Sequence, residues 1–392
     1  MQQVYIVSIA RTPMGSFGGS LASLSATELG SIAIKAAIER AGINAMHIQE
    51  LLMGNVCSAN LGQAPARQAG MGAELLPTTI CTTINKVCAS GMKAITLGTQ
   101  SIQLGYSDCV LAGGMESMSN IPYYLPNARW GLKFGAGSLI DGLQKDGLTD
   151  PFDKAVMGIF ADQTAKEYNI TREQQDEFAI ASYTKSAQTT NKGGFKSEIV
   201  PVSVSQKKGD ALIIDKDEEF TKVDFSKIPG LKPAFTTDGT VTAANASTIN
   251  DGASALVLMS ESKMKELNLS PIARIVSYAD AEQEPKKYTT TPVIAAPLAA
   301  KRAGLKINEI DYFEVNEAFA VVPLVFGKLL EIDAQKINIH GGAVSLGHPL
   351  GSSGSRIVCT LSQVLNQMNG QYGLAAICNG GGGATAIVLE RC

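Results

Sequence analysis

The sequence is poor in the features that mark several classes of protein. Of its 392 residues, three are His, one is Trp and only 18% are charged, and the formal net charge is −3. No run of five like charges occurs, so the basic footprint of a nucleic-acid-binding protein is missing. The longest apolar run spans 318–327, which is shorter than the roughly 18 residues a membrane span needs. We therefore expect no nucleic-acid partner and no membrane partner.

The sequence also has few signs of secretion or of metal binding. Its N-terminal residues show neither the basic segment of a signal peptide nor an Arg-rich transit peptide, and the last residues are not a peroxisomal tripeptide. It contains seven Cys, an odd number, and none form a C-x-x-C pair. This usage is typical of free thiols in a reducing compartment. We expect a cytoplasmic protein without a conventional zinc site.

What the sequence does contain is an alternation of short β-rich runs with Ala-rich helical stretches. The runs at 4–10, 50–56 and 108–117 are typical of strands, and those at 26–42 and 93–105 of helices. Hydrophobic residues make up 45% of the chain, enough for a large core. The alternation predicts the α/β class, and the length predicts two or three domains.

The alternation is repeated in the C-terminal part of the chain. Ile-Val-Ser occurs at 6–8 and at 275–277, and Arg-Ala-Gly at 40–42 and at 302–304. Each pair occupies the same type of element, a first strand and the end of a first helix. The later elements that continue the second series are expected at 273–281, 292–304, 310–318, 356–368 and 373–383. An ordered series at a nearly constant offset predicts two similarly folded halves.

The middle of the chain lies outside this repeat. It contains several prolines, a strongly charged stretch at 215–227 and a helical patch at 171–188. The apolar run at 250–260 then reads as the last strand of the first half. We therefore predict an N-terminal half formed by 1–118 plus 250–270, an inserted loop domain at 119–249 and a C-terminal half at 271–392.

Two candidate catalytic residues fall at matching places in the two halves. Cys88 and His348 each lie in a Gly/Ser-rich turn before an expected helix. A helix N-terminus lowers the pKa of a thiol, and a neighbouring His can accept its proton. A Cys is more often inert packing, and a His before Pro is more often a turn residue. Their matched positions nevertheless favour a Cys–His nucleophile pair.

Two further turns are expected at the same ends of strands. Asn316 follows the expected strand at 310–315, and Cys378 begins the segment Cys-Asn-Gly-Gly-Gly-Gly at 378–383. A run of Gly lets the backbone approach a ligand closely, with N–H groups that can face an oxyanion. Taken alone, such a run is also compatible with a simple tight turn, and Cys378 with a core position.

Four segments of the sequence resemble a known family. Asn-Lys-Val-Cys-Ala-Ser-Gly-Met-Lys-Ala (85–94), Asn-Glu-Ala-Phe (316–319), the Gly-His-Pro segment (341–351) and the Gly-rich segment (378–383) are similar to the signature blocks of the thiolases. The similarity covers nearly the whole chain. It implies a thiolase-like fold, with two repeated βαβαββ halves in a layered α-β-α-β-α arrangement and an inserted loop domain. It also implies a dimer or a homotetramer built as a dimer of dimers.

The resemblance implies a role for each candidate residue. Cys88 would carry an acetyl group as a thioester, and His348 would activate Cys88 and then hydrogen-bond the thioester oxygen of the second substrate. Cys378 would be the acid or base at the α-carbon, and Asn316 would hold a water molecule in that oxyanion hole. The N–H groups of Cys88 and Gly380 would form a second oxyanion hole.

These roles correspond to the activity of the short-chain members of the family. That activity is the reversible Claisen condensation of two acetyl-CoA molecules to acetoacetyl-CoA and CoA. Forming the acyl enzyme needs a thiolate, and removing the α-proton needs a base beside an oxyanion hole. The expected partners are acetyl-CoA and acetoacetyl-CoA. No cofactor is required, and CoA thioesters are the substrates.

The resemblance also implies positions for binding CoA and for an activating ion. Those expected to contact CoA are Ser247, Lys222, Lys227, Leu148, Met157, Phe235, Phe319 and Tyr183. Potassium-activated members use a Tyr hydroxyl and main-chain oxygens, which are hard ligands. The corresponding possible potassium ligands are Tyr183, Ala243, Ala244, Ala246 and Val344. Val156 departs from some bacterial members, which have His there, and so a polar contact to pantetheine is in doubt.

Three other functions remain as alternatives. The nearest is a 3-ketoacyl-CoA thiolase of β-oxidation with a broader substrate range. A decarboxylating ketoacyl synthase on the same fold typically pairs Cys with two His or with His and Asn, whereas Cys378 stands here at the last position. An inactive acyl-CoA carrier is expected to have lost one of Cys88, His348 and Cys378, and all three are present.

Overall fold

Ten strands form the frame of the structure, a computed structural model that describes residues 2–392. The strand order is β12-β13-β14-β11-β1-β10-β5-β3-β4, and β2 pairs with β10 at one side. The strands of the first half are β1 (Val4–Arg11), β2 (Gly15–Ser16), β3 (Glu50–Gly54), β4 (Ile80–Ile84), β5 (Cys109–Ser117) and β10 (Asn250–Ser260). Those of the second half are β11 (Ala273–Glu282), β12 (Tyr312–Val315), β13 (Tyr372–Asn379) and β14 (Gly383–Arg391). Only three residue pairs join β1 to β11, so the two halves of the sheet meet at one short seam.

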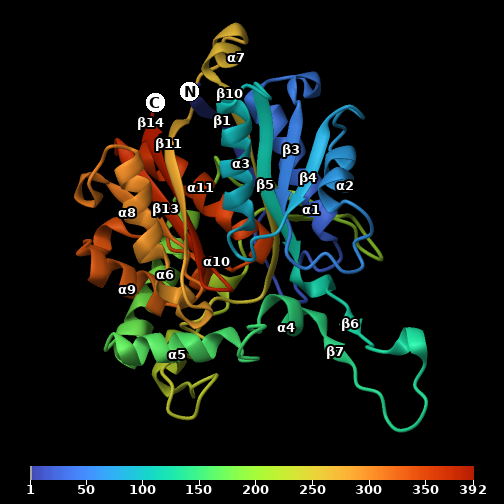
Figure 1. Ribbon diagram of the computed structural model, residues 1–392, viewed down its shortest axis with the longest axis vertical. Helices are drawn as coiled ribbons and strands as arrows, with labels where there is room; N and C mark the ends of the chain where they lie inside the picture. Colours follow the sequence, from blue (N-terminus) through green and yellow to red (C-terminus); the bar gives the residue numbers. More distant parts are fainter. Residues whose placement is uncertain (1) are drawn as a thin grey trace.

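Helices lie on both outer faces and between the two halves of the sheet (Figure 1). The helices beside the first half are α1 (Ala26–Ala41), α2 (Pro65–Gly72) and the short α7 (Glu261–Glu266). The central helices are α3 (Ser90–Gln103) and α11 (Leu350–Gln367), and those beside the second half are α8 (Pro292–Arg302) and α9 (Val321–Leu330). A core of buried aliphatic side chains from both sheet halves surrounds α3 and α11. The predicted α-β-α-β-α layering of a thiolase-like fold is therefore confirmed.

The internal repeat is visible in the detailed register of the strands. The pairing shifts between Ile6 and Ser8 in β1 and between Ile275 and Ser277 in β11, the same tripeptide in each half. Each of these two serines donates a hydrogen bond of 2.6 Å to a carbonyl of the helix that covers its strand, α1 or α8. A bulge bends a strand and increases its twist, so both halves are curved by the same device.

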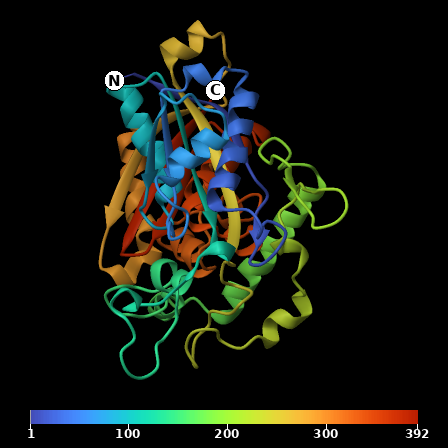
Figure 2. The same cartoon turned by 90° about the vertical axis from the view of Figure 1, so that its right-hand side faces the viewer.

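The segment between β5 and β10 lies mainly at the end of the molecule opposite the termini and along one flank (Figures 1 and 2). Its elements are β6 (Tyr123–Tyr124), β7 (Ile140–Asp141), α4 (Gly142–Gly147), α5 (Met157–Glu167), α6 (Arg172–Asn191), β8 (Val202–Val204) and β9 (Leu212–Ile214). β10 follows this segment and pairs with β1 and β5. The helix predicted at 171–188 is present as α6, and β10 returns to the first half as predicted.

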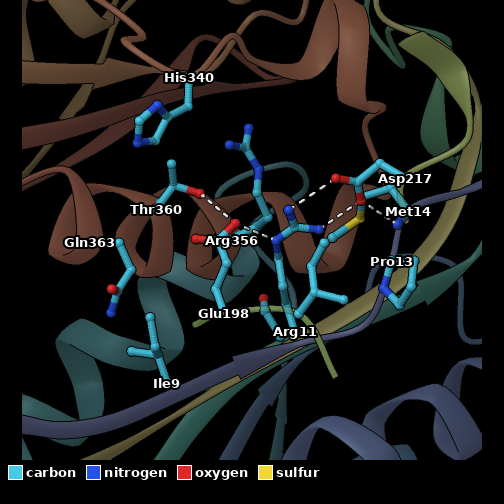
Figure 3. A network of polar contacts seen from close by, with 12 residues as sticks. Ile9, Arg11, Pro13, Met14, Glu198, Asp217, His340, Arg356, Thr360 and Gln363 are labelled. Atoms are coloured by element: carbon cyan, nitrogen blue, oxygen red, sulfur yellow. Dashed lines mark hydrogen bonds and ion pairs between the residues drawn. The ribbon is translucent and has the colours of Figure 1, made fainter. Parts of the chain in front are cut away.

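A buried ionic network fixes the inserted segment to the first half (Figure 3). Arg11 on β1 donates to Glu198 at 2.6 Å and to Asp217 at 2.7 and 3.0 Å, and the Arg11 side chain is fully buried. Because a buried charge is tolerated only when it is paired and hydrogen-bonded, this network holds two loops of the inserted segment in defined places beside β1.

Some element boundaries differ from those that the sequence predicts. The strands expected at 310–318 and 373–383 end at Val315 and Asn379, because the chain turns there to form the site. The helix expected at 356–368 begins earlier, at Leu350, since its Gly and Ser residues are helical where they pack against α3. The sequence analysis did not identify β4, β14, α2 or α9 as elements. None of the helices within residues 2–392 combines the length and the apolarity required to cross a membrane.

Candidate active site

Close packing of two helix N-termini creates the site. A Cβ atom at Gly114 would lie 1.9 Å from the carbonyl oxygen of Gly351, and one at Gly91 would lie 2.6 Å from Ser355 Oγ. Glycine is therefore required at these positions, where backbone meets backbone or a buried side chain. The contact brings the start of α3 against the start of α11, and with them the turns that carry Cys88 and His348. The prediction that these two turns face each other is consistent with this packing.

Cys88 precedes α3 and lies partly accessible beside a small apolar cluster. Burial of its thiol raises the pKa of Cys88 to about 12, although the N–H groups of Gly380 and of Cys88 itself donate to the sulfur and act in the opposite direction. The sequence predicted a lowered pKa from the helix N-terminus. That prediction is wrong, because desolvation of the thiolate outweighs the backbone dipoles. Cys88 is therefore a protonated thiol at neutral pH.

His348 is buried, and one nitrogen of its ring has a hydrogen-bond partner. Its backbone N–H donates to Asn250 Oδ1 at 2.9 Å, and its Nδ1 lies 2.6 Å from Ser353 Oγ. Burial, with a further contribution from the positive charge of Arg356, lowers the pKa of His348 to about 3. Nε2 is buried and has no hydrogen-bond partner among residues 2–392. The imidazole is thus neutral, with one nitrogen left for the site.

Cys378 and Asn316 stand at the ends of neighbouring parallel strands, β13 and β12. Burial and then the negative charge of Cys88 raise the pKa of Cys378, and both thiols contribute to the raised pKa of Tyr288, so the two sulfurs lie in one environment. The Asn316 backbone N–H bonds to Ala376 at 2.9 Å, but neither atom of its side-chain amide has a partner within the described residues. A buried amide without partners is rare in proteins and calls for a ligand or a water molecule.

The Gly-rich turn after β13 passes directly beside Cys88. A Cβ at Gly380 would contact Met157 and Val87, the residue before Cys88, each at 3.6 Å. Gly382 has φ +94, and a Cβ there would lie 2.2 Å from the Gln283 carbonyl oxygen. The strict requirement for glycine is thus at Gly382, and the resulting turn aims the Gly380 N–H at Cys88.

Several residues predicted to contact CoA line one open pocket of about 510 Å³. Those that line it are Lys222, Phe235 and Ser247, together with two of the residues predicted as potassium ligands, Ala243 and Ala246. The aromatic rings of Phe235 and Phe319 meet edge to face with centroids 5.9 Å apart. The pocket therefore combines polar side chains such as Lys222 and Ser247 with an aromatic wall at Phe235.

The other residues predicted to contact CoA lie partly in hydrophobic clusters and partly at the protein surface. Met157 packs in the same core cluster as Cys378 and Phe319, and Leu148 packs in the cluster that includes Cys88. Lys222 donates to Ser16 Oγ at the mouth of the pocket. Lys227 does not line the pocket and is largely exposed, with an ion pair to Asp224 at 3.2 Å.

The predicted potassium ligands are divided between two neighbouring places. Tyr183 packs with Val344 in one small cluster, and burial raises the pKa of Tyr183 to about 12. Ala243 and Ala246 line the pocket, and Ala244 is buried behind it. Glu219 lines the same pocket and also raises the pKa of Tyr183, so the two places are close. Across residues 2–392, no three His, Cys, Asp or Glu side chains form a cluster suited to a metal ion.

The sequence analysis did not assign a role to Glu116, which the structure places near Cys88 and against the first turn of α11. Its carboxylate accepts hydrogen bonds from the N–H groups of Val56, Cys57 and Gly351 at distances between 2.9 and 3.2 Å. Burial raises the pKa of Glu116 to about 7. The sequence held a signal for Glu116, because it lies in Gly-Gly-Met-Glu-Ser (113–117), at the end of the strand expected at 108–117. Glu116 joins the loop after β3 to the first turn of α11, and so links the two halves.

Comparisons with known families agree with this geometry. Residues 4–262 match the family description "Thiolase, N-terminal domain", and residues 269–391 match "Thiolase, C-terminal domain". The two descriptions together account for nearly the whole chain.

Similar proteins match over their full length. The chain is 56% identical to a "Probable acetyl-CoA acetyltransferase" of Dictyostelium discoideum, with 100% of this chain and 94% of that protein covered. It is 53% identical to an "Acetyl-CoA acetyltransferase" of Schizosaccharomyces pombe, with 99% of each covered. A solved structure, the Acat5 thiolase from Ascaris suum in complex with coenzyme A, superimposes with a TM-score of 0.95 at 47% identity and covers 100% of both chains.

Proposed function

Because the chain belongs to the thiolase family, we propose that it is an acetyl-CoA C-acetyltransferase, which interconverts two acetyl-CoA with acetoacetyl-CoA and CoA. The observation that carries the proposal is that the turns of Cys88 and His348 precede α3 and α11, whose first turns are in contact, and that a second thiol, Cys378, shares the environment of Cys88. The names of the relatives, which include cytosolic and mitochondrial acetyl-CoA acetyltransferases, favour this activity over a 3-ketoacyl-CoA thiolase of broader range.

The first half of thiolysis transfers an acetyl group to Cys88. His348 Nε2 takes the thiol proton as the sulfur attacks the 3-keto carbon of acetoacetyl-CoA. The N–H groups of Gly380 and Cys88, which already face the sulfur, then stabilise the oxyanion. Collapse of this intermediate breaks the carbon–carbon bond and leaves acetyl-Cys88 and the enolate of acetyl-CoA. Preorganised donors of this kind supply a large part of the catalysis of acyl transfer.

The second thiol completes this half-reaction. The raised pKa keeps Cys378 protonated at rest, so its S–H can give a proton to the enolate carbon. The enolate oxygen receives hydrogen bonds from protonated His348 and from a water molecule held by the free amide of Asn316. Cys378 is left as a thiolate and acetyl-CoA departs.

The second half of thiolysis restores the resting enzyme. The Cys378 thiolate removes the proton of an incoming CoA thiol, and the CoA sulfur attacks acetyl-Cys88. Collapse releases acetyl-CoA and a Cys88 thiolate, which recovers its proton from His348. The same steps in reverse carry out the condensation. No step needs a metal or a redox cofactor as a reactant.

The pocket of about 510 Å³ is the proposed entrance for CoA. Ser247 and Lys222 would hold the polar part of the pantetheine and the nucleotide, while Met157, Leu148, Phe235 and Phe319 would line the way to Cys88. Lys227 lies outside the pocket, so it would serve only the phosphates beyond the mouth. A potassium ion bound between Tyr183, Val344 and the carbonyls of 243–246 would order the loops that carry Ser247 and His348.

Association into a homotetramer and a cytosolic location complete the proposal. The hairpin of β6 and β7 exposes Trp130 and Phe134, and the edge strand β4 exposes Ile80. Exposed apolar groups and an unpaired strand edge are suited to association with further copies. All seven Cys are free thiols, which fits a reducing compartment. The division into two halves and an inserted domain at 119–249 also remains part of the proposal.

The activity can be tested with thiolysis assays across a series of 3-ketoacyl-CoA substrates. We expect acetoacetyl-CoA to be preferred and the rate to decline as the acyl chain lengthens. Cys88→Ser should abolish acetyl-enzyme formation, because a Ser hydroxyl is not ionised by one His and a helix N-terminus. A stable acetyl adduct on a peptide that lacks residue 88 would contradict the assignment, and preference for long chains would favour the broader thiolase.

A further inference from the structure

One nitrogen of the His348 ring, Nδ1, lies beside a hydroxyl group of α11. Ser353, one turn into α11, places its Oγ 2.6 Å from His348 Nδ1. The same Oγ donates to the carbonyl of Pro349 at 3.0 Å, in an i to i−4 contact within the helix. Ser353 is 1% exposed and His348 is 5% exposed, so water does not compete freely for these contacts.

A hydroxyl group has a single proton, so its hydrogen bonds determine which nitrogen of the neutral imidazole is protonated. A Ser hydroxyl has one proton to donate and lone pairs to accept with. The Pro349 carbonyl can only accept a hydrogen bond, so a Ser353 hydroxyl that serves both contacts donates to Pro349 and accepts at the short contact to His348. Nδ1 of the neutral ring must then carry the proton. The other nitrogen, Nε2, keeps its lone pair and has no partner in residues 2–392.

We propose that Ser353 is the positioning residue of the reaction, which holds the proton of His348 on Nδ1 and so presents an unprotonated Nε2 to Cys88. The inference rests on the proposed function, because it assigns a task to His348 in acyl transfer. In metal and triad sites, too, the hydrogen bond on one ring nitrogen sets which form the other presents.

A neutral hydroxyl group suits a His that must also release its proton. A carboxylate at this position would stabilise the imidazolium and retain the proton taken from Cys88. Arg356, one turn further along α11, adds a positive charge that also disfavours the imidazolium. Ser353 therefore orients the ring without trapping the proton, so that the imidazolium can return the proton to Cys88 at the end of the reaction.

The first test uses single substitutions and the rate of Cys88 acetylation by acetyl-CoA. In Ser353→Ala the ring loses its partner, and we expect the rate at saturating acetyl-CoA to fall about 10- to 100-fold, as for other small misplacements of catalytic groups, with the KM little changed. Ser353→Thr keeps the hydroxyl group and should recover most of the rate.

Ser362→Ala provides a matched control on the same helix. Ser362 is buried, and its Oγ donates to the Val358 carbonyl at 2.8 Å in the same i to i−4 geometry, with no contact to His348. This variant should acetylate at the wild-type rate. Equal losses in Ser353→Ala and Ser362→Ala would show that the loss comes from the helix and would overturn the positioning role.

The second test needs no variant of Ser353. Nitrogen-15 NMR of His-labelled wild-type protein, with His348→Asn for assignment among the three His, reports which ring nitrogen carries the proton. We expect a protonated Nδ1 and an unprotonated Nε2. A proton on Nε2 in the resting enzyme would overturn the inference even if the acetylation assay confirms the proposed function. A wild-type protein that is not acetylated at all would instead contradict the proposed function.

Discussion

The two halves of the molecule place different pairs of residues at the same position of their sheets. In the first half, Gly54 of β3 pairs with Gly114 of β5, and Asn55 and Glu116 follow one and two residues later. In the second half, Val315 of β12 pairs with Ala376 of β13, and the residues at the same two steps are Asn316 and Cys378. Asn55 therefore corresponds to Asn316, and Glu116 to Cys378.

The two pairs differ in how their polar atoms are satisfied. Asn55 Nδ2 donates to Glu116 Oε1 at 2.9 Å, and the same carboxylate accepts from three backbone N–H groups. Both side-chain atoms of Asn316 lack partners within residues 2–392. One position thus stabilises the structure, whereas the other is left open for chemistry. Since buried polar groups are almost always paired, the unpaired member of a repeated position is the one to assign to function.

Of the substitutions at these four positions that keep Cys378, Asn316→Ala should have the largest effect on rate. It removes the amide that holds the water donor of the proposed enolate hole, and the loss of one such donor costs roughly 10²–10³-fold in rate. Condensation and thiolysis should fall by this factor. Because the amide has no partners to lose, the midpoint of urea unfolding should hardly change. A marked loss of stability with unchanged rates would reverse the assigned roles.

Glu116→Ala should act on stability first. The substitution leaves three backbone N–H groups and the Asn55 amide without their acceptor, and buried unsatisfied groups cost about 1–3 kcal/mol each before water relieves some of them. We expect a loss of about 3 kcal/mol in the free energy of unfolding. Asn55→Ala should lower stability by a smaller amount. If Asn55→Ala and Asn316→Ala proved equally destabilising, the contrast between the two halves would fail.

The lowered pKa of His348 predicts an unusual pH dependence for the rate of Cys88 acetylation. His348 is the competent base above its pKa, and this pKa is lowered to about 3. Cys88 acetylation should therefore stay nearly constant between pH 7 and pH 5, whereas a His with the ordinary pKa of about 6.5 would lose about 30-fold at pH 5. The rate of Cys88 acetylation can be measured by stopped flow across this pH range. A midpoint of the rate near pH 6.5 would contradict the lowered pKa of His348.

The raised pKa of Cys88 should have a smaller effect, on how its alkylation rate changes with pH. The pKa of this thiol is raised to about 12, so its rate of reaction with iodoacetamide should keep rising with pH through the neutral and mildly alkaline range. A plateau near pH 8 would indicate the lowered pKa that the helix N-terminus alone suggests.

Much of this arrangement could be predicted from the sequence, and the exceptions have physical causes. The Ile-Val-Ser repeat predicted the two halves because identical bulges need similar local sequences. The matched turns predicted that the segments carrying Cys88 and His348 face each other, which is consistent with the contact between the starts of α3 and α11. The direction of the Cys88 pKa shift was predicted wrongly, because desolvation depends on packing that no local sequence pattern encodes. Ser353 and Glu116 were missed because their partners are set by helix contacts and by strand register.

The most direct measurement follows the two half-reactions in Cys378→Ser. The account predicts that acetylation of Cys88 by acetyl-CoA largely survives, because His348 and the N–H groups of Gly380 and Cys88 are unchanged. It predicts that exchange of the acetyl-CoA α-protons with deuterated solvent falls by roughly 10²–10⁴-fold, the usual contribution of a general acid or base. Equal losses in both assays would mean that Cys378 is structural, as Glu116 is in the first half, and would contradict the central claim.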